Sequence, residues 1–282
     1  MILPAPGESF TWRDTAFGPA LVCTAVEAVA SHFFTTRHWA LGDANRDAGE
    51  AWAEVGRAAG VGANAFVRLR QVHGGATVVA EASQTPRTSE SLPDADIVLA
   101  GTPDLAVAVQ GADCVPLLIA DRRLGVVAAA HAGWRGLALG VPRLAVEALA
   151  AQYGSRPSDL VAAIGPSVGA CCYEVGPEVR EAFAASGVPE GTVSGWFHGR
   201  PQPTEWNPSR PGLPLELREG HAFFDGWACA REQLSRAGLP VAAVFTARLC
   251  TASHPDLLCS YRLHGRRAGR IAGAIRPRAV MR

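Results

Sequence analysis

Residues 114–136 read CVPLLIADRRLGVVAAAHAGWRG, and this stretch decides the class of fold. It contains two short apolar runs, Val115–Asp121 and Gly125–His131, joined by a polar turn. Runs this continuously apolar are typical of strands buried on both faces, because a strand with one solvated face alternates polar and apolar residues. Ala95–Ala100 and Leu105–Gln110 are runs of the same kind just upstream. We therefore expect a central sheet that is covered on both sides.

Helical spacing follows this stretch directly. Trp134–Tyr153 is expected to be a helix that stops at Gly154, and Pro142 either kinks it or marks its true start. The remaining elements are expected as follows: helices over Asp47–Gly60, Gly176–Ala185 and Phe223–Ala237; strands over Phe66–Leu69, Thr77–Ala80, Leu160–Ile164, Val241–Leu249 and Arg270–Ile275; a strand or short helix over Leu21–Phe34; and a long loop over Val188–Leu217.

The order of these elements predicts the fold class. Strands and helices intersperse without strict alternation, which favours an α/β fold of the α+β type over a doubly wound parallel sheet. The sequence contains no internal repeat and no convincing linker. We therefore predict a single layered domain over residues 1–282, with mixed β-sheets flanked by helices.

The composition excludes several functional classes. Apolar residues make up 48% of the chain, which excludes intrinsic disorder. Basic and acidic residues balance at 26 each, so no basic excess supports nucleic-acid binding. Every one of the basic residues is arginine, which excludes Schiff-base catalysis through lysine.

Hydropathy and cysteine usage predict the cellular compartment of the protein. No stretch reaches the roughly 18 apolar residues of a membrane helix, and Met1–Phe17 does not resemble a signal peptide. The seven cysteines are scattered and odd in number, unlike a secreted disulfide framework. We expect a cytoplasmic protein with no membrane partner.

Two histidines and one cysteine stand at predicted turns or strand ends beside small residues. His73 lies in QVHGG, Cys114 in ADCVP and His131 in HAGWRG. Two imidazoles and a thiolate suit zinc, whose catalytic sites keep three protein ligands and one open position, and copper accepts the same donors. The three residues form no local metal motif, so they meet only if the fold brings them together.

Other interpretations of these residues stay open. A cysteine inside an apolar run is most often a small buried hydrophobe, and a histidine after a buried strand is most often a hydrogen-bonded core group. A third interpretation makes Cys114 a nucleophile, His131 its base and Asp113 the residue that orients the imidazole.

Two arginines are candidates for holding phosphate. Arg37 follows Thr35-Thr36, and Arg262 follows Ser260-Tyr261. A guanidinium is the natural fork for phosphate oxygens, although a solvated surface position is the ordinary reading of an arginine.

Five motifs occur in an order that resembles a known family. They are QVHG (71–74), ADC (112–114), HAGWRG (131–136), IGP…CCYEVG (164–176) and SYR (260–262). Together, over about residues 33–272, they resemble the bacterial laccase-domain family, also called the polyphenol oxidase or peptidoglycan editing factor (YfiH-type) family.

The resemblance implies a function and a set of site residues. Members are regarded as purine nucleoside phosphorylases with adenosine deaminase activity, acting on adenosine, inosine or methylthioadenosine with phosphate. The fold implied is a cytotoxic-necrotizing-factor/YfiH-like layered domain. The family's Zn²⁺ ligands fall on His73, Cys114 and His131, with Cu²⁺ as the possible substitute. Asp113, or the more distant Glu174, would then serve as general acid or base. Vicinal Cys171 and Cys172 match the family pattern, and we assign them no catalytic role.

One segment departs from the family. Members usually carry Gly-Gly-Val-Ser after the Thr-Thr-Arg motif and Leu-Asn-Leu-Gly later, whereas here Arg37 runs directly into HWALGD. We expect this shortened loop to affect substrate range and turnover, and to leave the metal ligands unaffected.

Two alternative activities follow from the same residues. A copper-dependent polyphenol oxidase normally uses several copper ions, and three ligands make at most one copper site. A cysteine hydrolase built on Cys114 and His131 would be inactivated by alkylation and indifferent to chelators.

Overall fold

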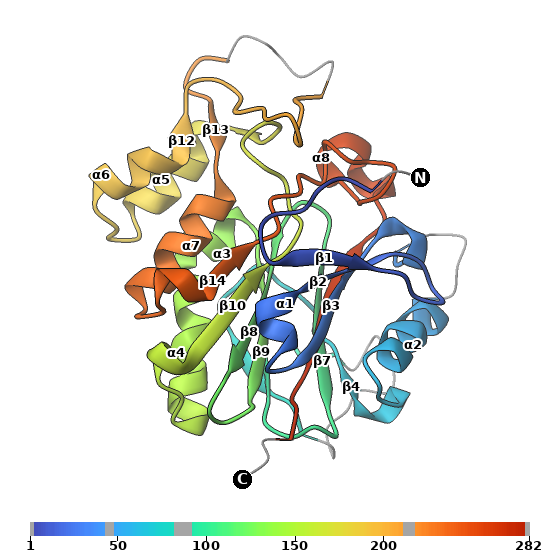
Figure 1. Ribbon diagram of the computed structural model, residues 1–282. Helices are drawn as coiled ribbons and strands as arrows, with labels where there is room; N and C mark the ends of the chain where they lie inside the picture. The colour runs from blue at the N-terminus through green and yellow to red at the C-terminus, as the bar shows by residue number, and fades with distance from the viewer. Residues whose placement is uncertain (1–2, 43–47, 82–91, 211–217, 280–282) are drawn as a thin grey trace.

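The computed structural model describes residues 3–42, 48–81, 92–210 and 218–279, and it stacks two mixed sheets face to face (Figure 1). The first sheet has the order β1 (Phe10–Arg13), β2 (Ala20–Cys23), β3 (Ser31–Thr35), β15 (Ile271–Arg276), β7 (Ala106–Gly111) and β4 (Phe66–Val67). The second has the order β14 (Val244–Thr246), β10 (Leu160–Ile164), β8 (Val115–Asp121), β9 (Val127–Ala132), β6 (Ile97–Ala100) and β5 (Thr77–Val79). A small third sheet joins β11 (Glu174–Val175), β13 (Ala222–Phe224) and β12 (Phe197–His198). The fold is therefore of the predicted mixed α/β class.

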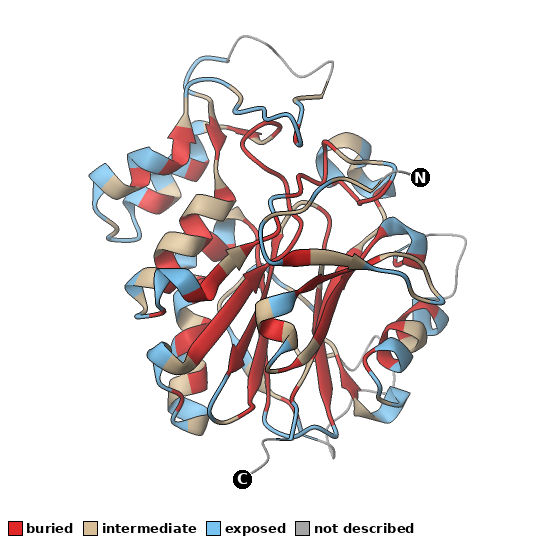
Figure 2. Ribbon diagram, viewed as in Figure 1, coloured by how far each residue is buried: buried red, intermediate tan, exposed pale blue. Residues whose placement is uncertain are grey.

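The quoted stretch forms the centre of the second sheet. β8 and β9 pair antiparallel, and every residue of both strands is buried. Leu118 and Ala120 of β8 pack into the core between the two sheets, whereas Leu117 and Ile119 pack against the helices. This alternation follows from the two-residue period of a strand. In Figure 2 the central strands of the sheets are red, the colour of buried residues, and the two apolar clusters lie on opposite faces of β8, so the prediction of a doubly covered sheet is confirmed.

Helices cover the outer faces of the two sheets. The second sheet is covered by α3 (Trp134–Leu139), α4 (Val141–Tyr153) and α7 (Gly226–Arg236). The first is covered by α2 (Ala48–Ala58), which buries Trp52 and Val55 against it. The shorter helices are α1 (Thr24–Glu27), α5 (Pro177–Ala184), α6 (Glu190–Val193) and α8 (Tyr261–His264).

Several predicted boundaries differ from the structure. The helix expected over Trp134–Tyr153 is two helices, because Gly140 adopts a left-handed φ of 82° and Pro142 lies in the first turn of the second. The helix expected from Phe223 begins at Gly226, where Asp225 caps it by accepting a hydrogen bond from the Ala228 N–H at 2.9 Å. The strand expected over Val241–Leu249 is a 3₁₀ turn followed by the short β14.

Other differences lie at the ends of the chain and in the long loop. β1 was not predicted, and the segment expected as a loop contains α6 and β12. Asp43, Asp47 and residues 211–217 belong to predicted segments and lie outside the described residues. Within the described ranges, no helix has both the length and the apolar character needed to cross a membrane.

Candidate metal centre and active site

Three side chains from distant parts of the chain meet at one end of the second sheet. Cys114 immediately precedes β8, His131 lies in β9 opposite Pro116, and His73 lies on the loop between β4 and β5. The ligand atoms of the three lie within 4.8 Å of one another. The Cys114 Sγ is 3.9 Å from the His73 Nε2, and the two imidazole centroids are 4.9 Å apart. The β8–β9 hairpin and one loop thus bring together the three residues that the sequence singled out.

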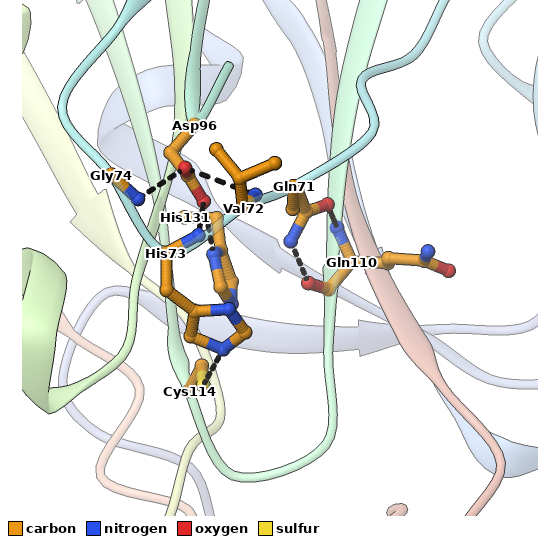
Figure 3. A network of polar contacts seen from close by, with 8 residues as sticks. All are labelled: Gln71, Val72, His73, Gly74, Asp96, Gln110, Cys114 and His131. Carbon is orange, nitrogen blue, oxygen red and sulfur yellow. Dashed lines mark hydrogen bonds and ion pairs between the residues drawn. The ribbon is translucent and has the colours of Figure 1, made fainter. Parts of the chain in front are cut away.

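A buried carboxylate supports this group. Asp96, which is fully buried, lies 2.8 Å through its Oδ1 from the His131 Nδ1 (Figure 3). Its two oxygens also accept the backbone N–H groups of Val72, His73 and Gly74, at 3.2, 3.1 and 2.6 Å. One carboxylate therefore orients one imidazole and fixes the backbone that carries the other.

Sequence reasoning missed Asp96. It lies inside the predicted apolar run Ala95–Ala100 and directly precedes β6, and a single acidic residue within an apolar run is the one signal that could have pointed to it. The orienting role that we expected for Asp113 is filled by Asp96 in the structure.

The electrostatics favour a thiolate beside an imidazolium. Burial raises the pKa of the Cys114 thiol, but the neighbouring His131 and His73 outweigh it and lower that pKa to about 6. Burial likewise lowers the pKa of His131, but Cys114 and Asp96 outweigh it and raise that pKa to about 9. The pKa of Asp96 is lowered because hydrogen bonds from His131 and the loop exceed the cost of burial. A thiolate is the form in which cysteine binds metals.

The backbone around the three side chains is unusual. His73 and Asp113 adopt φ values of 60° and 90°, which side-chain-bearing residues rarely adopt. Gln71 holds the His73 loop to β7, because its side-chain amide exchanges two hydrogen bonds, of 2.7 and 2.8 Å, with the backbone of Gln110. A Cβ on Gly133 would lie 2.9 Å from the Cys114 Sγ, so the absence of a side chain there keeps the space beside the thiol clear.

A cavity of about 900 Å³ opens beside the group. Its wall includes the three candidate ligands, the aromatic side chains of Trp134, Tyr173 and Tyr261, and four arginines, Arg70, Arg135, Arg262 and Arg270. The Arg262 guanidinium lies over the Tyr173 ring at 5.3 Å, and its Nη2 donates to the Glu174 carbonyl at 2.7 Å. The cavity therefore combines flat aromatic surfaces with guanidinium groups.

The other predicted residues lie in different surroundings. Arg37 is exposed and donates to the Pro255 carbonyl, and it is absent from the described lining of the cavity. Asp113 does line the cavity, but its carboxylate accepts the Thr251 hydroxyl and the Arg262 N–H, both at 2.5 Å. Glu174 is buried against Arg218, 3.1 Å away, and His221, 3.0 Å away. Through these contacts Asp113 holds the Arg262 segment in place. The Glu174 carboxylate is paired with Arg218.

The donor set fits a metal ion. Two imidazole nitrogens and one sulfur are ligands that zinc and copper both accept. Asp96 occupies the Nδ1 of His131 and leaves its Nε2 for a metal, which is the carboxylate–histidine pairing common in zinc sites. The clear space beside Gly133 is consistent with an ion held between the sulfur and the imidazoles.

Comparisons with known proteins agree with the five motifs. Residues 27–278 match the family described as "Multi-copper polyphenol oxidoreductase laccase". Curated relatives named purine nucleoside phosphorylase include one from Streptomyces coelicolor, 36% identical over 77% of this chain and 76% of the relative, and YfiH of Escherichia coli, 33% identical over 74% and 72%. A third, from Bacteroides thetaiotaomicron, is 31% identical over 68% of this chain, and the match spans 64% of that relative.

Solved structures show the same architecture. The Bacillus licheniformis protein YfiH superposes with a TM-score of 0.80 at 23% identity, covering 95% of this chain and 99% of that one. A Neisseria meningitidis protein superposes with a TM-score of 0.67 at 28% identity, covering 96% and 100%. With the family match extending over most of its length, the chain belongs to the laccase-like, YfiH-type family of enzymes.

Proposed function

We propose that this protein is a zinc-dependent purine nucleoside phosphorylase that also deaminates adenosine. Its substrates would be adenosine, inosine or methylthioadenosine together with phosphate, and it would act in the cytoplasm as a single domain over residues 1–282. One observation carries the proposal: His73, Cys114 and His131 converge within 4.8 Å at the wall of an arginine-lined cavity. The names of the curated relatives support the substrate class.

In this proposal, the three converging residues hold zinc. Bound there, zinc would supply a Lewis acid and lower the pKa of a coordinated water from about 15.7 towards about 7. Asp96 acts as a positioning residue, because a proton on His131 Nδ1 shared with its carboxylate leaves the Nε2 lone pair free. The Asp113 carboxylate accepts hydrogen bonds from Thr251 and from the Arg262 N–H, so we assign it the role of positioning the Arg262 segment in place of the acid–base role expected from the sequence.

Phosphorolysis assigns a different role to the arginines. An oxygen of phosphate bonds to the ribose C1′, the bond from C1′ to the purine nitrogen breaks, and the purine leaves with that electron pair and takes up a proton. Arg262 is the proposed phosphate fork, because its Nη2 contact to Glu174 and its stacking on Tyr173 fix its plane. Arg37 is absent from the described lining of the cavity, whereas Arg135 is part of it, so Arg135 takes the second phosphate-binding role that the sequence had suggested for Arg37.

The cysteine-hydrolase alternative has one observation in its favour. Cys114, His131 and Asp96 form a thiol–imidazole–carboxylate series, and the Cys114 pKa is lowered to about 6. A nucleophilic cysteine needs one imidazole, however, and here His73 approaches the same sulfur at 3.9 Å. Two imidazoles around one thiolate favour a metal, and turnover that resists a strong chelator would favour the hydrolase.

The test combines metal analysis with a product assay. Purified protein would be incubated with adenosine, inosine or methylthioadenosine, with and without phosphate, and its zinc and copper content measured. We expect free base and ribose 1-phosphate with phosphate present, loss of activity in His73→Ala, and retention in His198→Ala, a histidine of β12 outside the cavity lining. Base release that is independent of phosphate would indicate a hydrolase. If conversion of adenosine to inosine were the sole reaction, the deaminase activity would stand and the phosphorylase activity would not.

A further inference from the structure

Three further cysteines form a second cluster outside the cavity just described. Cys171, Cys172 and Cys250 are 2%, 0% and 0% exposed, and their sulfur atoms lie within 4.8 Å of one another. The proposed function assigns them no role. The sequence shows Cys171 and Cys172 as neighbours, but it gives no indication that Cys250 joins them.

The topology explains why they meet. β10 and β14 are adjacent parallel strands, so the segments that follow them leave the same edge of the sheet (Figure 1). Ser167 and Cys250 form a parallel bridge just beyond the strands, supported by hydrogen bonds from the Ser167 N–H to the Leu249 carbonyl and from the Thr251 N–H to the Ser167 carbonyl. The two segments are therefore joined by backbone hydrogen bonds before either reaches the cluster.

Polar groups surround the sulfur atoms. The Ser253 Oγ lies 3.5 Å from the Cys171 Sγ and 3.7 Å from the Cys172 Sγ. The Gly169 N–H donates to the Cys250 Sγ at 3.3 Å. The Arg210 guanidinium holds the backbone that carries Ser253, donating to the carbonyls of Ala252 and Ser253 at 2.7 and 2.9 Å. The Ser253 hydroxyl donates its proton to the Pro208 carbonyl at 2.7 Å, so its oxygen lone pairs remain for a thiol proton or a cation. The Gly169 N–H is the donor that suits a negatively charged sulfur.

We propose that Cys171, Cys172 and Cys250 form a second metal site for a thiophilic cation, either Zn²⁺ with the Ser253 hydroxyl as fourth ligand or Cu⁺ held by the three sulfurs alone. In a tetrahedral site with Zn–S of about 2.3 Å and Zn–O of about 2.1 Å, sulfur and oxygen ligands lie about 3.6 Å apart. The two Ser253 distances of 3.5 and 3.7 Å match this spacing. Binding displaces the thiol protons to solvent.

Two further observations support the proposal: a cavity reaches the cluster, and the other buried cysteines are not grouped in this way. Cys171 lies at the wall of a separate cavity of about 500 Å³, which also includes Thr204, Trp206 and Asn207 and gives an ion a route inward. Cys171, Cys172 and Cys250 also pack with Val168 and Ala252, and Cys23 and Cys229 are buried in other apolar clusters. Among the described residues, Cys23 and Cys229 belong to neither group of three possible ligands. Cysteines that are buried only as small apolar residues have no reason to place three sulfur atoms within ligand distance of one another.

The test disables the His73, Cys114 and His131 site by mutation and measures how much metal the protein still binds. Apo-protein would be titrated anaerobically with Zn²⁺ and, separately, with Cu⁺, in wild type, Cys114→Ser, Cys250→Ala and the double variant. We expect about two equivalents per chain for wild type, about one for each single variant, and none for the double variant. Cys23→Ala, which removes a buried thiol elsewhere, should keep both. Binding of one ion and not the other identifies the metal and supports the site.

A second measurement does not depend on folding of the Cys250 variant. In Cys114→Ser, added metal should slow alkylation of all three clustered cysteines, mapped by peptide mass, and leave Cys23 and Cys229 unchanged. Stoichiometric metal in wild type that vanishes entirely in Cys114→Ser would overturn the proposal. So would unchanged alkylation rates, or a mass lower by two hydrogens that places a disulfide within the cluster. The count of two equivalents rests on the metal site of the proposed function. Protection of the clustered cysteines in Cys114→Ser does not, so it tests this second site by itself.

Discussion

Replacing Asp96 by asparagine tests whether one buried carboxylate supports both the metal site and the fold around it. Its Oδ1 contacts His131 Nδ1 and accepts the His73 N–H, and its Oδ2 accepts the N–H groups of Val72 and Gly74. Asparagine is the same size but offers one accepting oxygen. Whichever way the amide turns, its NH₂ group faces two donors, and those donors lose their acceptor.

Two separate losses follow from this geometry. Two orphaned donors at roughly 1–3 kcal/mol each, with the Val72 and Gly74 groups partly solvated, lower the free energy of unfolding by about 2–4 kcal/mol. Removal of the carboxylate behind a metal-bound histidine typically costs about 10–100-fold in metal affinity, or about 1.4–2.7 kcal/mol. Both losses are expected in the same variant.

The assay measures the two quantities independently. Urea denaturation of apo-protein gives the free energy of unfolding, and competition with a chromophoric chelator gives the affinity of folded protein for zinc. Asp104→Asn is the matched control, because Asp104 is an exposed aspartate and should change neither value. An Asp96→Asn protein that binds zinc as tightly as wild type would refute the assignment of Asp96 as the support of His131, whatever its stability.

Three further predictions follow from the site. Cys114→Ala and His131→Ala should each abolish tight zinc binding at this site, as measured by metal analysis, because one of three ligands is lost. Between the Cys114 pKa of about 6 and the His131 pKa of about 9, zinc displaces the His131 proton, so apparent affinity should rise about tenfold per pH unit; a flat profile in isothermal titration would contradict this. Gly133→Ala should lower zinc affinity with little change in stability, because the new Cβ meets the Cys114 sulfur at 2.9 Å; Gly195→Ala, with no neighbour within 4 Å, is its control.

The central sheet was predictable from the sequence, and its partners were not. Continuous apolar runs such as Val115–Asp121 require cover on both faces, which the structure provides as a second sheet and a layer of helices. Nothing in such a run specifies which face meets a sheet and which meets helices. Pro142 was correctly taken as a possible helix start, whereas the separate helix α3 and its end at Gly140 were not predicted, because the apolar positions of α3 and α4 keep helical spacing across the break.

The candidate ligands were predictable, and their supports were not. His73, Cys114 and His131 stand beside glycines and strand ends, and the family motifs single them out. Asp96 acts through hydrogen bonds to a loop more than twenty residues away, so its role depends on the pairing of β5 with β6. Cys250 is similarly invisible, because it meets Cys171 through the pairing of β10 with β14.

The backbone of the site explains why metal binding and folding should be coupled at some positions and separable at others. His73 and Asp113 hold left-handed φ values of 60° and 90°, each costing roughly 1–3 kcal/mol. Asp96 offsets the first cost through the N–H groups of the His73 loop, and Thr251 and Arg262 offset the second through the Asp113 carboxylate. These bonds form between protein groups alone, so the geometry is set by folding before any ion binds. A change at Asp96 must therefore weaken both stability and affinity, whereas Gly133, at an ordinary φ of −70°, touches the ligands and not their supports. If Gly133→Ala destabilised the apo-protein as much as Asp96→Asn does, the ligands themselves would be holding the loops together, and this division between ligands and supports would be wrong.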